Sequence, residues 1–186
     1  MPPEAGNFPL TGTKNLPHVA VAYGPGAEHW SDRVASGSIV PGEAVVPAGS
    51  ANAQGYMLMR TANAEDVIGQ LAICLRPIDV PDINTGPTAL GPNEIRNQTM
   101  ADGDWVHPYY SGGFTLTLVD PNRTYVAGML LGWDADGARP AGIAGVGSWA
   151  PNENADIDSF FEVAKVTKVG TGGEVVLKVR TLRTNA

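Results

Sequence analysis

Short apolar runs in which every second residue is polar constrain this chain more than any other feature. Phe114, Leu116 and Leu118 alternate with threonines, and Leu177 and Val179 alternate with a lysine and an arginine near the carboxyl end. A period of two is that of a β-strand with one buried face and one wetter face. The 23 Gly and 15 Pro residues exceed average usage and favour short strands joined by many turns. Because no stretch has the apolar spacing of a helix of three or more turns, the sequence predicts an all-β fold.

Two hairpins are expected from turn residues that follow such runs. The first spans residues 114–137, where residues 120–122, Asp-Pro-Asn, supply turn chemistry before a second apolar run. The second joins residues 160–166 to residues 174–182 across the Gly-rich residues 170–173. We expect the first hairpin to be the central scaffold of the domain and the second to close the chain.

The chain divides by composition into an arm, residues 1–37, and a β-domain, residues 38–186. A length of 186 residues suits one domain with a core of its own. The first segment is rich in Pro, Gly, Asn and Ser and has only short apolar clusters, so it cannot bury enough surface to fold alone. It is either a flexible tail or an extended arm that orders against a neighbouring subunit, with Tyr23, His29 and Trp30 as anchors.

Several segments interrupt or modify the expected sheet. Residues 67–75 are expected as a strand, since a Gly and several β-branched residues argue against a buried helix. Residues 76–103 form a long Pro-rich loop, which is a binding surface, another functional loop or a partly disordered segment. Trp105 restarts the sheet and is expected in the core. The small residues of 137–150 predict a loop or close backbone packing.

Charge and cysteine content narrow the classes of function. The formal net charge of −7 and the pI near 4.8 argue against nucleic acid as a partner. No segment resembles a signal peptide or a membrane span, so the chain is expected to fold in a cytoplasm without a membrane partner. Cys74 is the single cysteine, which argues against a disulfide framework and a Cys-based zinc site. Its apolar neighbours predict a small buried side chain.

No catalytic constellation is present in the sequence. His18, His29 and His107 are scattered and lack the helical spacing of metal ligands. A nucleophile elbow, a dinucleotide-binding fingerprint and a phosphate-binding loop are also missing from the sequence. We therefore expect a protein that is not an enzyme and that has no cofactor.

Two acidic loops offer oxygen ligands. Asp134 and Asp136 precede a Gly, as alternating carboxylates do at the start of a calcium loop, but the Glu that completes an EF-hand loop is missing. Asp156 and Asp158 lie in a second polar loop. Turn chemistry explains both loops without a metal, so no metal ligand is predicted and cation binding at these two loops stays open.

Aromatic residues are the remaining signal. Tyr109 and Tyr110 lie close to the long Pro-rich loop and would suit a sugar-stacking platform or a protein-binding patch. Three classes of function are open: a structural protein that binds a protein lattice, a carbohydrate-binding or host-adhesion module, and a metal-dependent hydrolase without a recognisable motif. Together with the arm anchors, the candidate partner-binding residues are Tyr23, His29, Trp30, Tyr109 and Tyr110.

Three segments together resemble the small head decoration proteins of tailed bacteriophages. They are residues 39–45, Ile-Val-Pro-Gly-Glu-Ala-Val, residues 67–72, Val-Ile-Gly-Gln-Leu-Ala, and residues 102–106, Asp-Gly-Asp-Trp-Val. The resemblance is one of pattern over residues 38–110, and the carboxyl-terminal hairpin has no counterpart in it. It implies a compact antiparallel β-barrel or β-sandwich, β-tulip-like, with an extended amino-terminal arm and a long Pro-rich loop.

The same resemblance implies a role. Head decoration proteins are capsid cement: trimers sit on the capsid exterior where subunits meet, and they clamp adjacent subunits together. By this resemblance the chain is expected in the virion, after assembly in the host cytoplasm. Its expected partners are the major capsid protein and further copies of itself, as a homotrimer. Such a role needs buried area and symmetry but no bond-making chemistry.

Overall fold

The fold is known from a computed structural model, which describes residues 20–76, 99–169 and 175–182. Within these residues every long element is a β-strand, and helical turns are confined to two three-residue 3₁₀ segments, η1 and η3. The all-β prediction is therefore confirmed. The elements in chain order are β1 (Ala20–His29), β2 (Arg33–Ala35), β3 (Ala44–Ala51), β4 (Met57–Thr61), η1 (Ile68–Gln70), β5 (Ala72–Leu75), β6 (Trp105–Leu116), β7 (Leu130–Asp134), β8 (Ser148–Pro151), η3 (Asn152–Asn154), β9 (Ile157–Val169) and β10 (Val175–Thr181).

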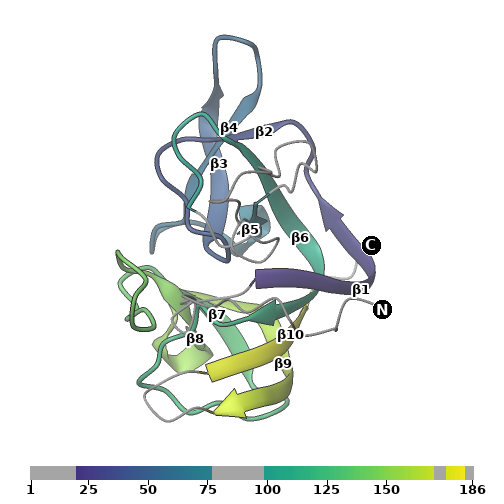
Figure 1. Cartoon of the computed structure of the whole chain (residues 1–186), viewed down its shortest axis with the longest axis vertical. Helices are drawn as coiled ribbons and strands as arrows, with labels where there is room; N and C mark the ends of the chain where they lie inside the picture. Colours follow the sequence, from purple (N-terminus) through teal and green to yellow (C-terminus); the bar gives the residue numbers. More distant parts are fainter. Residues whose placement is uncertain (1–19, 77–98, 170–174, 183–186) are drawn as a thin grey trace, which may run out of the picture.

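Five strands close into a small barrel, which forms the upper half of Figure 1. The order around the barrel is β2–β4–β3–β5–β6, and β2 pairs with both β4 and β6, which closes the ring. These pairings are antiparallel except that of β2 with β4, which is parallel. The interior holds the buried residues Ala35, Ile39, Val45, Met59, Ala72, Cys74, Met100 and Val106. The predicted barrel is present, and Cys74 is buried in it as expected.

The second half of the chain forms a further sheet below the barrel, and β6 belongs to both parts (Figure 1). The first half of β6 pairs with β5 and β2, and its second half pairs with β1 and β10. Beyond β10 the sheet continues in the order β9–β7–β8. A parallel bridge between Val119 and Trp149 brings β8 back to the residues that follow β6. One long strand therefore ties the barrel to the second sheet.

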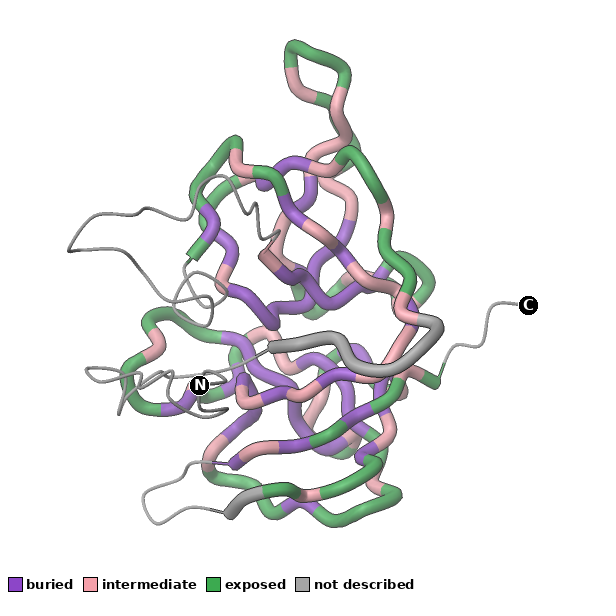
Figure 2. The backbone as a smooth tube through the Cα atoms, turned by 45° about the vertical axis from the view of Figure 1, so that its right-hand side comes forward, coloured by how far each residue is buried: buried purple, intermediate pink, exposed green. Residues whose placement is uncertain are grey.

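A shared core fills the space between the barrel and the second sheet. Val46 and Ile73 from the barrel belong to the same buried cluster as Trp133, Trp149 and Phe161 from the second sheet. The ring centroids of Trp133 and Trp149 lie 5.3 Å apart, and those of Trp149 and Phe161 lie 4.6 Å apart, both edge to face. Figure 2 shows buried backbone in both parts and exposed residues at the turns and tips. The two parts therefore share one hydrophobic interior.

Of the two expected hairpins, one forms. β9 and β10 pair antiparallel, with Val163 opposite Val179 and Val166 opposite Leu177, which confirms the carboxyl-terminal hairpin. The expected hairpin over residues 114–137 is wrong, because in the described sheet β7 pairs with β8 and β9 and not with β6. Both edges of β6 are already occupied. β5 and β2 pair with its first half, and β1 and β10 pair with its second half, so no edge is left for β7.

The described residues before Ser38 already contain two strands, β1 and β2, so the prediction that regular structure begins near Ser38 is wrong. β1 pairs with β6 of the same chain, with Tyr23 opposite Gly113, and β2 is a member of the barrel. The Gly- and Pro-containing sequence of β1 gives no alternating pattern, and the strand takes its place from the neighbouring strand β6. Residues 1–19 of the expected arm lie outside the described residues.

Two further expectations need correction, and a third holds for most of its residues. Trp105 is 50% exposed and is not a core residue, because at the start of β6 its neighbour Val106 takes the buried side of the strand. Residues 68–70 form the turn η1, so the strand expected over residues 67–75 shortens to β5. Residues 137–147 form the expected loop, with Gly137 and Gly147 packed closely against their neighbours, and only the end of the small-residue stretch departs from it, as part of the buried strand β8. Residues 77–98, most of the Pro-rich loop, lie outside the described residues.

Candidate functional site

Four of the candidate partner-binding residues meet where the end of β1 pairs with β6. Two groups of rings lie there: His29, His107 and Tyr109 contact one another, and Trp30 contacts Tyr110. Because consecutive strand residues such as Tyr109 and Tyr110 point to opposite sides of a sheet, the two groups lie on opposite sides of the strand pair. We call these five residues together the aromatic surface. His29 lies directly opposite Tyr109 in the β-ladder. Its ring centroid is 4.5 Å from that of His107 and 4.9 Å from that of Tyr109, and the centroids of Trp30 and Tyr110 are 5.4 Å apart. His29 is exposed and the other four residues are partly exposed.

The aromatic surface is anchored to the core beneath it. Trp30 packs against the barrel core, and Tyr109 meets Phe114 edge to face at 5.8 Å. The Tyr110 hydroxyl donates to the Glu28 carboxylate at 2.9 Å, and this hydrogen bond raises the pKa of Tyr110. Burial raises the pKa of Tyr109, so both phenols are neutral at physiological pH. Rings that are already held in place need little further ordering, which suits binding a partner.

One further aromatic residue, Trp105, extends the row along β6, and the candidate Tyr23 lies apart from it. Trp105 contacts Tyr56 edge to face at 4.7 Å, and Tyr56 is the last residue of the turn between β3 and β4. The β3–β4 hairpin projects from the barrel (Figure 1). Trp105, His107 and Tyr109 occupy alternate positions of β6, which places them on the same side of the sheet. Sequence reasoning missed Trp105 as a surface residue, although this spacing could have identified it. Tyr23 lies nearer the start of β1, where its backbone pairs with that of Gly113 in β6.

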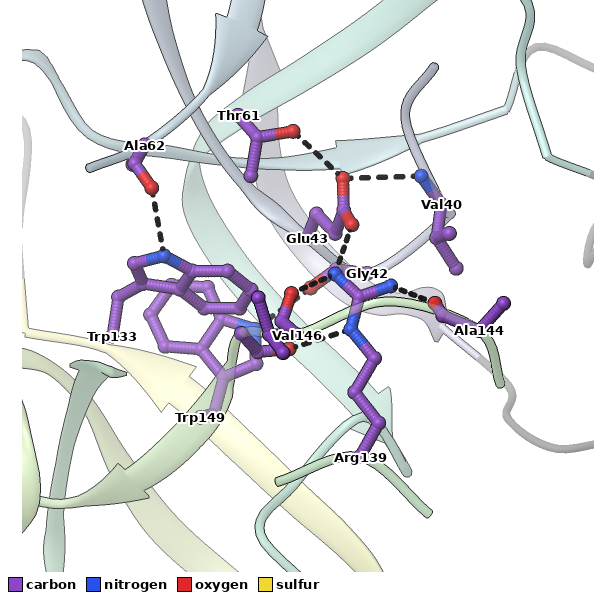
Figure 3. A network of polar contacts seen from close by, with 11 residues as sticks. Val40, Gly42, Glu43, Thr61, Ala62, Trp133, Arg139, Ala144, Val146 and Trp149 are labelled. Carbon is purple, nitrogen blue, oxygen red and sulfur yellow. Dashed lines mark hydrogen bonds and ion pairs between the residues drawn. The ribbon is translucent and has the colours of Figure 1, made fainter. Parts of the chain in front are cut away.

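A buried ion pair joins the barrel to the second sheet (Figure 3). Glu43 lies just before β3, Arg139 lies between β7 and β8, and both side chains are 4% exposed. The guanidinium of Arg139 donates to one oxygen of Glu43. The other oxygen accepts from the Val40 amide at 3.1 Å and from the Thr61 hydroxyl at 2.9 Å. Buried charges are tolerated when they are paired and hydrogen-bonded, and both conditions are met here.

Two tryptophans add hydrogen bonds across the same junction. Trp133 Nε1 donates to the Ala62 carbonyl at 3.1 Å, and Trp149 Nε1 donates to the Gly42 carbonyl at 2.7 Å. Gly42 follows Pro41 in a turn, and its positive φ of 95° is the conformation that the second central residue of a type II turn requires. We call the ion pair and these two hydrogen bonds the clasp. Sequence reasoning missed the clasp because the ion partners are 96 residues apart and Trp149 is 107 residues from Gly42.

The acidic loops are accounted for by turns. The Asp136 amide donates to the Asp134 carboxylate at 3.1 Å, and the Ala135 amide donates to the Asp156 carboxylate at 2.9 Å. Desolvation, assisted by the nearby carboxylates, raises the pKa of Asp134. Asp158 is exposed on β9. In the described part of the chain, no group of three or more His, Cys, Asp or Glu side chains could hold a metal ion.

Comparisons with protein-family models, with curated proteins and with solved structures find no significant match to this chain. Among the described residues, no helix has the length and hydropathy required to cross a membrane. What the aromatic surface can bind must therefore be inferred from its own geometry. It presents partly exposed rings and the Glu28 carboxylate on a rigid strand pair, an arrangement that can stack and hydrogen-bond.

Proposed function

We propose that this chain is a capsid decoration protein, which binds between the major capsid subunits of a tailed bacteriophage through the aromatic surface. The observation that carries the proposal is that His29, Trp30, Tyr109 and Tyr110 gather at the end of the β1–β6 pair as two ring pairs, one on each side of the strands. Residue type alone predicts these four as partner-binding residues, and the pairing of β1 with β6 brings His29 beside Tyr109 and Trp30 beside Tyr110. The pattern resemblance over residues 38–110 supports the class of partner.

Aromatic rings on a rigid strand pair suit a protein contact. Tyr and Trp are enriched in interface hot spots because they bring a large contact area with few rotatable bonds. A single surface of this kind binds weakly, but a homotrimer on a lattice of matching symmetry multiplies the contact through avidity. The proposal therefore includes self-association and a location on the capsid exterior.

Rebinding to purified phage heads that lack this protein tests the proposal. The wild-type chain is expected to saturate the heads at a fixed ratio to the major capsid protein. Trp30→Ala and Tyr110→Ala are each expected to lower the affinity at least about tenfold, as the loss of a hot-spot ring does. Tyr56→Ala is the matched control, because Tyr56 is also partly exposed and lies outside the aromatic surface. Wild-type protein that fails to bind heads would refute the proposed function.

A short deletion tests the contribution of the expected arm. Removing residues 1–35 would also remove β1 and β2, and with them the closure of the barrel. Removing residues 1–19 leaves every described strand in place. An arm that ties the protein to a neighbouring subunit predicts lower head occupancy for this shorter deletion, with an unchanged unfolding transition. Unchanged occupancy would confine the contact to the rest of the chain.

A carbohydrate-binding module is the second candidate function. It is favoured by the Glu28 carboxylate, which lies beside the paired rings of Trp30 and Tyr110. Sugar rings stack on aromatic faces while their hydroxyls donate to carboxylates. Binding to defined glycans that is lost in Tyr109→Ala or Tyr110→Ala, together with no binding to heads, would favour the carbohydrate module over the capsid protein.

A further inference from the structure

The register of β1 against β6 brings two histidines together. The described residues contain two histidines, His29 and His107, which lie far apart in the sequence. His29 lies opposite Tyr109 in the β-ladder, and His107 is two positions before Tyr109, on the same side of β6. The two histidines are therefore diagonal neighbours across the strand pair, and their ring centroids are 4.5 Å apart. The sequence lacks the helical spacing of metal ligands, but the sheet brings two imidazoles together instead.

The separation of the two rings fits two adjacent ligands of one metal ion. A metal–nitrogen bond of about 2.0–2.1 Å places the ion roughly 3.2 Å from the centre of each imidazole ring. Two rings bound at about 90° to each other then have centres about 4.5 Å apart, whereas two rings bound at the tetrahedral angle have centres about 5.2 Å apart. The observed 4.5 Å agrees with the first arrangement, which the square-planar and tetragonal sites of Cu²⁺ and Ni²⁺ adopt.

We propose that His29 and His107 form a binding site for one divalent transition-metal ion, of which Cu²⁺ and Ni²⁺ fit the geometry best. Imidazole nitrogen is a favoured ligand of both ions. The two side chains supply two coordination positions, and water fills the others. A site with two protein ligands is consistent with the absence of any suitable group of three among the described residues. The inference does not depend on the proposed function.

The two ligands are accessible, and the strands position their backbones. His29 is exposed and His107 is partly exposed. His107 lies opposite Leu75 of β5, and next to it the Trp30 amide donates to the Pro108 carbonyl at 3.0 Å. The torsion that turns a histidine ring is broad, so the exposed His29 ring can direct a nitrogen at the ion without movement of the strand. The net charge of −7 also attracts cations to the protein.

Calorimetric titration of the untagged full chain with Ni²⁺ tests the site. The affinity is expected to be at least about tenfold higher for the wild type than for His29→Ala or His107→Phe, because the second imidazole binds as an intramolecular ligand. His29 is exposed and Phe keeps a ring at position 107, so both variants are expected to fold. His18→Ala, which removes the other histidine of the chain, is the matched control and is expected to change the affinity less than about twofold. Equal affinity of the wild type and both site variants would overturn the inference.

Electron paramagnetic resonance of bound Cu²⁺ identifies the ligands directly. The wild-type spectrum is expected to show coupling to the nitrogens of two imidazoles, and each site variant is expected to show at most one. An ion held by both strands also joins β1 to β6 in the folded state alone, so excess Ni²⁺ is expected to raise the urea midpoint of the wild type and not that of His29→Ala. A wild-type spectrum with a single imidazole would reduce the site to adventitious binding and overturn the inference.

Discussion

Arg139→Met removes the cation of the clasp but keeps much of the side-chain volume, so the Glu43 carboxylate stays buried without its ion partner. Removing one partner of a buried ion pair costs about 3–5 kcal/mol. The hydrogen bonds that Glu43 accepts from the Val40 amide and the Thr61 hydroxyl reduce this loss of stability, but they do not replace the positive charge of Arg139. The carbonyl of the buried Gly147 also loses its donor, which adds about 1 kcal/mol. We expect a total loss of about 4–6 kcal/mol in the free energy of unfolding.

Glu43→Gln completes a double-mutant cycle. The glutamine amide keeps an oxygen for the Val40 amide and the Thr61 hydroxyl, but it carries no charge that needs a partner. In this background Arg139 is a buried cation without its acid, so Arg139→Met also relieves the penalty of that unpaired charge. Its net cost, from the carbonyls between β7 and β8 that lose their donor and from lost packing, is therefore expected to be at most about 2 kcal/mol. The coupling free energy between the two positions is therefore expected to be at least about 2 kcal/mol.

Urea unfolding followed by tryptophan fluorescence measures both quantities. Trp133 and Trp149 are fully buried beside the clasp, so their emission reports its loss. Equal m-values among the variants are required before midpoints are converted to free energies. A cost below about 1 kcal/mol for Arg139→Met, as found for exposed ion pairs, would refute the reasoning. Equal costs in the two backgrounds would refute it as well, because independent sites are additive.

Three other substitutions or reactions test the packing and the charges. Gly147→Ala is expected to cost at least about 3 kcal/mol in urea unfolding, because its Cβ would lie 2.6 Å from Trp133 at a φ of +97°. Gly103→Ala is the control, with a φ of +88° and nothing within 4 Å, and is expected to cost about 1 kcal/mol; equal costs would contradict the close packing. Desolvation and nearby carboxylates raise the pKa of Asp134, so its ionisation weakens the folded state at neutral pH. Asp134→Asn is therefore expected to raise the free energy of unfolding at neutral pH by less than about 1 kcal/mol, given the partial exposure of the carboxylate. The gain is expected to vanish below about pH 3.9, where the wild-type carboxyl is protonated in both states, and a gain that persists there would contradict its cause. Burial raises the pKa of the Cys74 thiol, so its labelling at mildly alkaline pH is expected to follow global unfolding as urea is added; fast labelling of the native protein would contradict its burial.

Local patterns account for part of the fold. The hairpin of β9 and β10 could be predicted from sequence. Its alternating apolar and polar residues and the Gly-rich turn between them all lie within about 25 residues of one another along the chain. The hairpin over residues 114–137 could not be excluded from sequence, because the choice of partner for β6 is made by β1 and β10, at the two ends of the chain. β1 itself has no alternating pattern, so its place follows from long-range pairing.

The candidate site, like the fold, could be predicted only in part from the sequence. Residue type was enough to select Trp30 and Tyr110, since large aromatic residues outside a clear core pattern are typical of binding surfaces. Their meeting depends on the register of β1 against β6, which no local pattern encodes. The clasp was beyond prediction, because Glu43 and Arg139 each look like an ordinary surface charge in their own segment and pair across 96 residues.

Cryo-electron microscopy of purified virions, or of heads rebound with this chain, tests the central claim most directly. We predict density for the chain on the capsid exterior, with Trp30 and Tyr110 in van der Waals contact with the major capsid protein. A decorated capsid in which the aromatic surface faces solvent would contradict the assigned contact. Virions that contain no copy of the chain would contradict the proposed function itself.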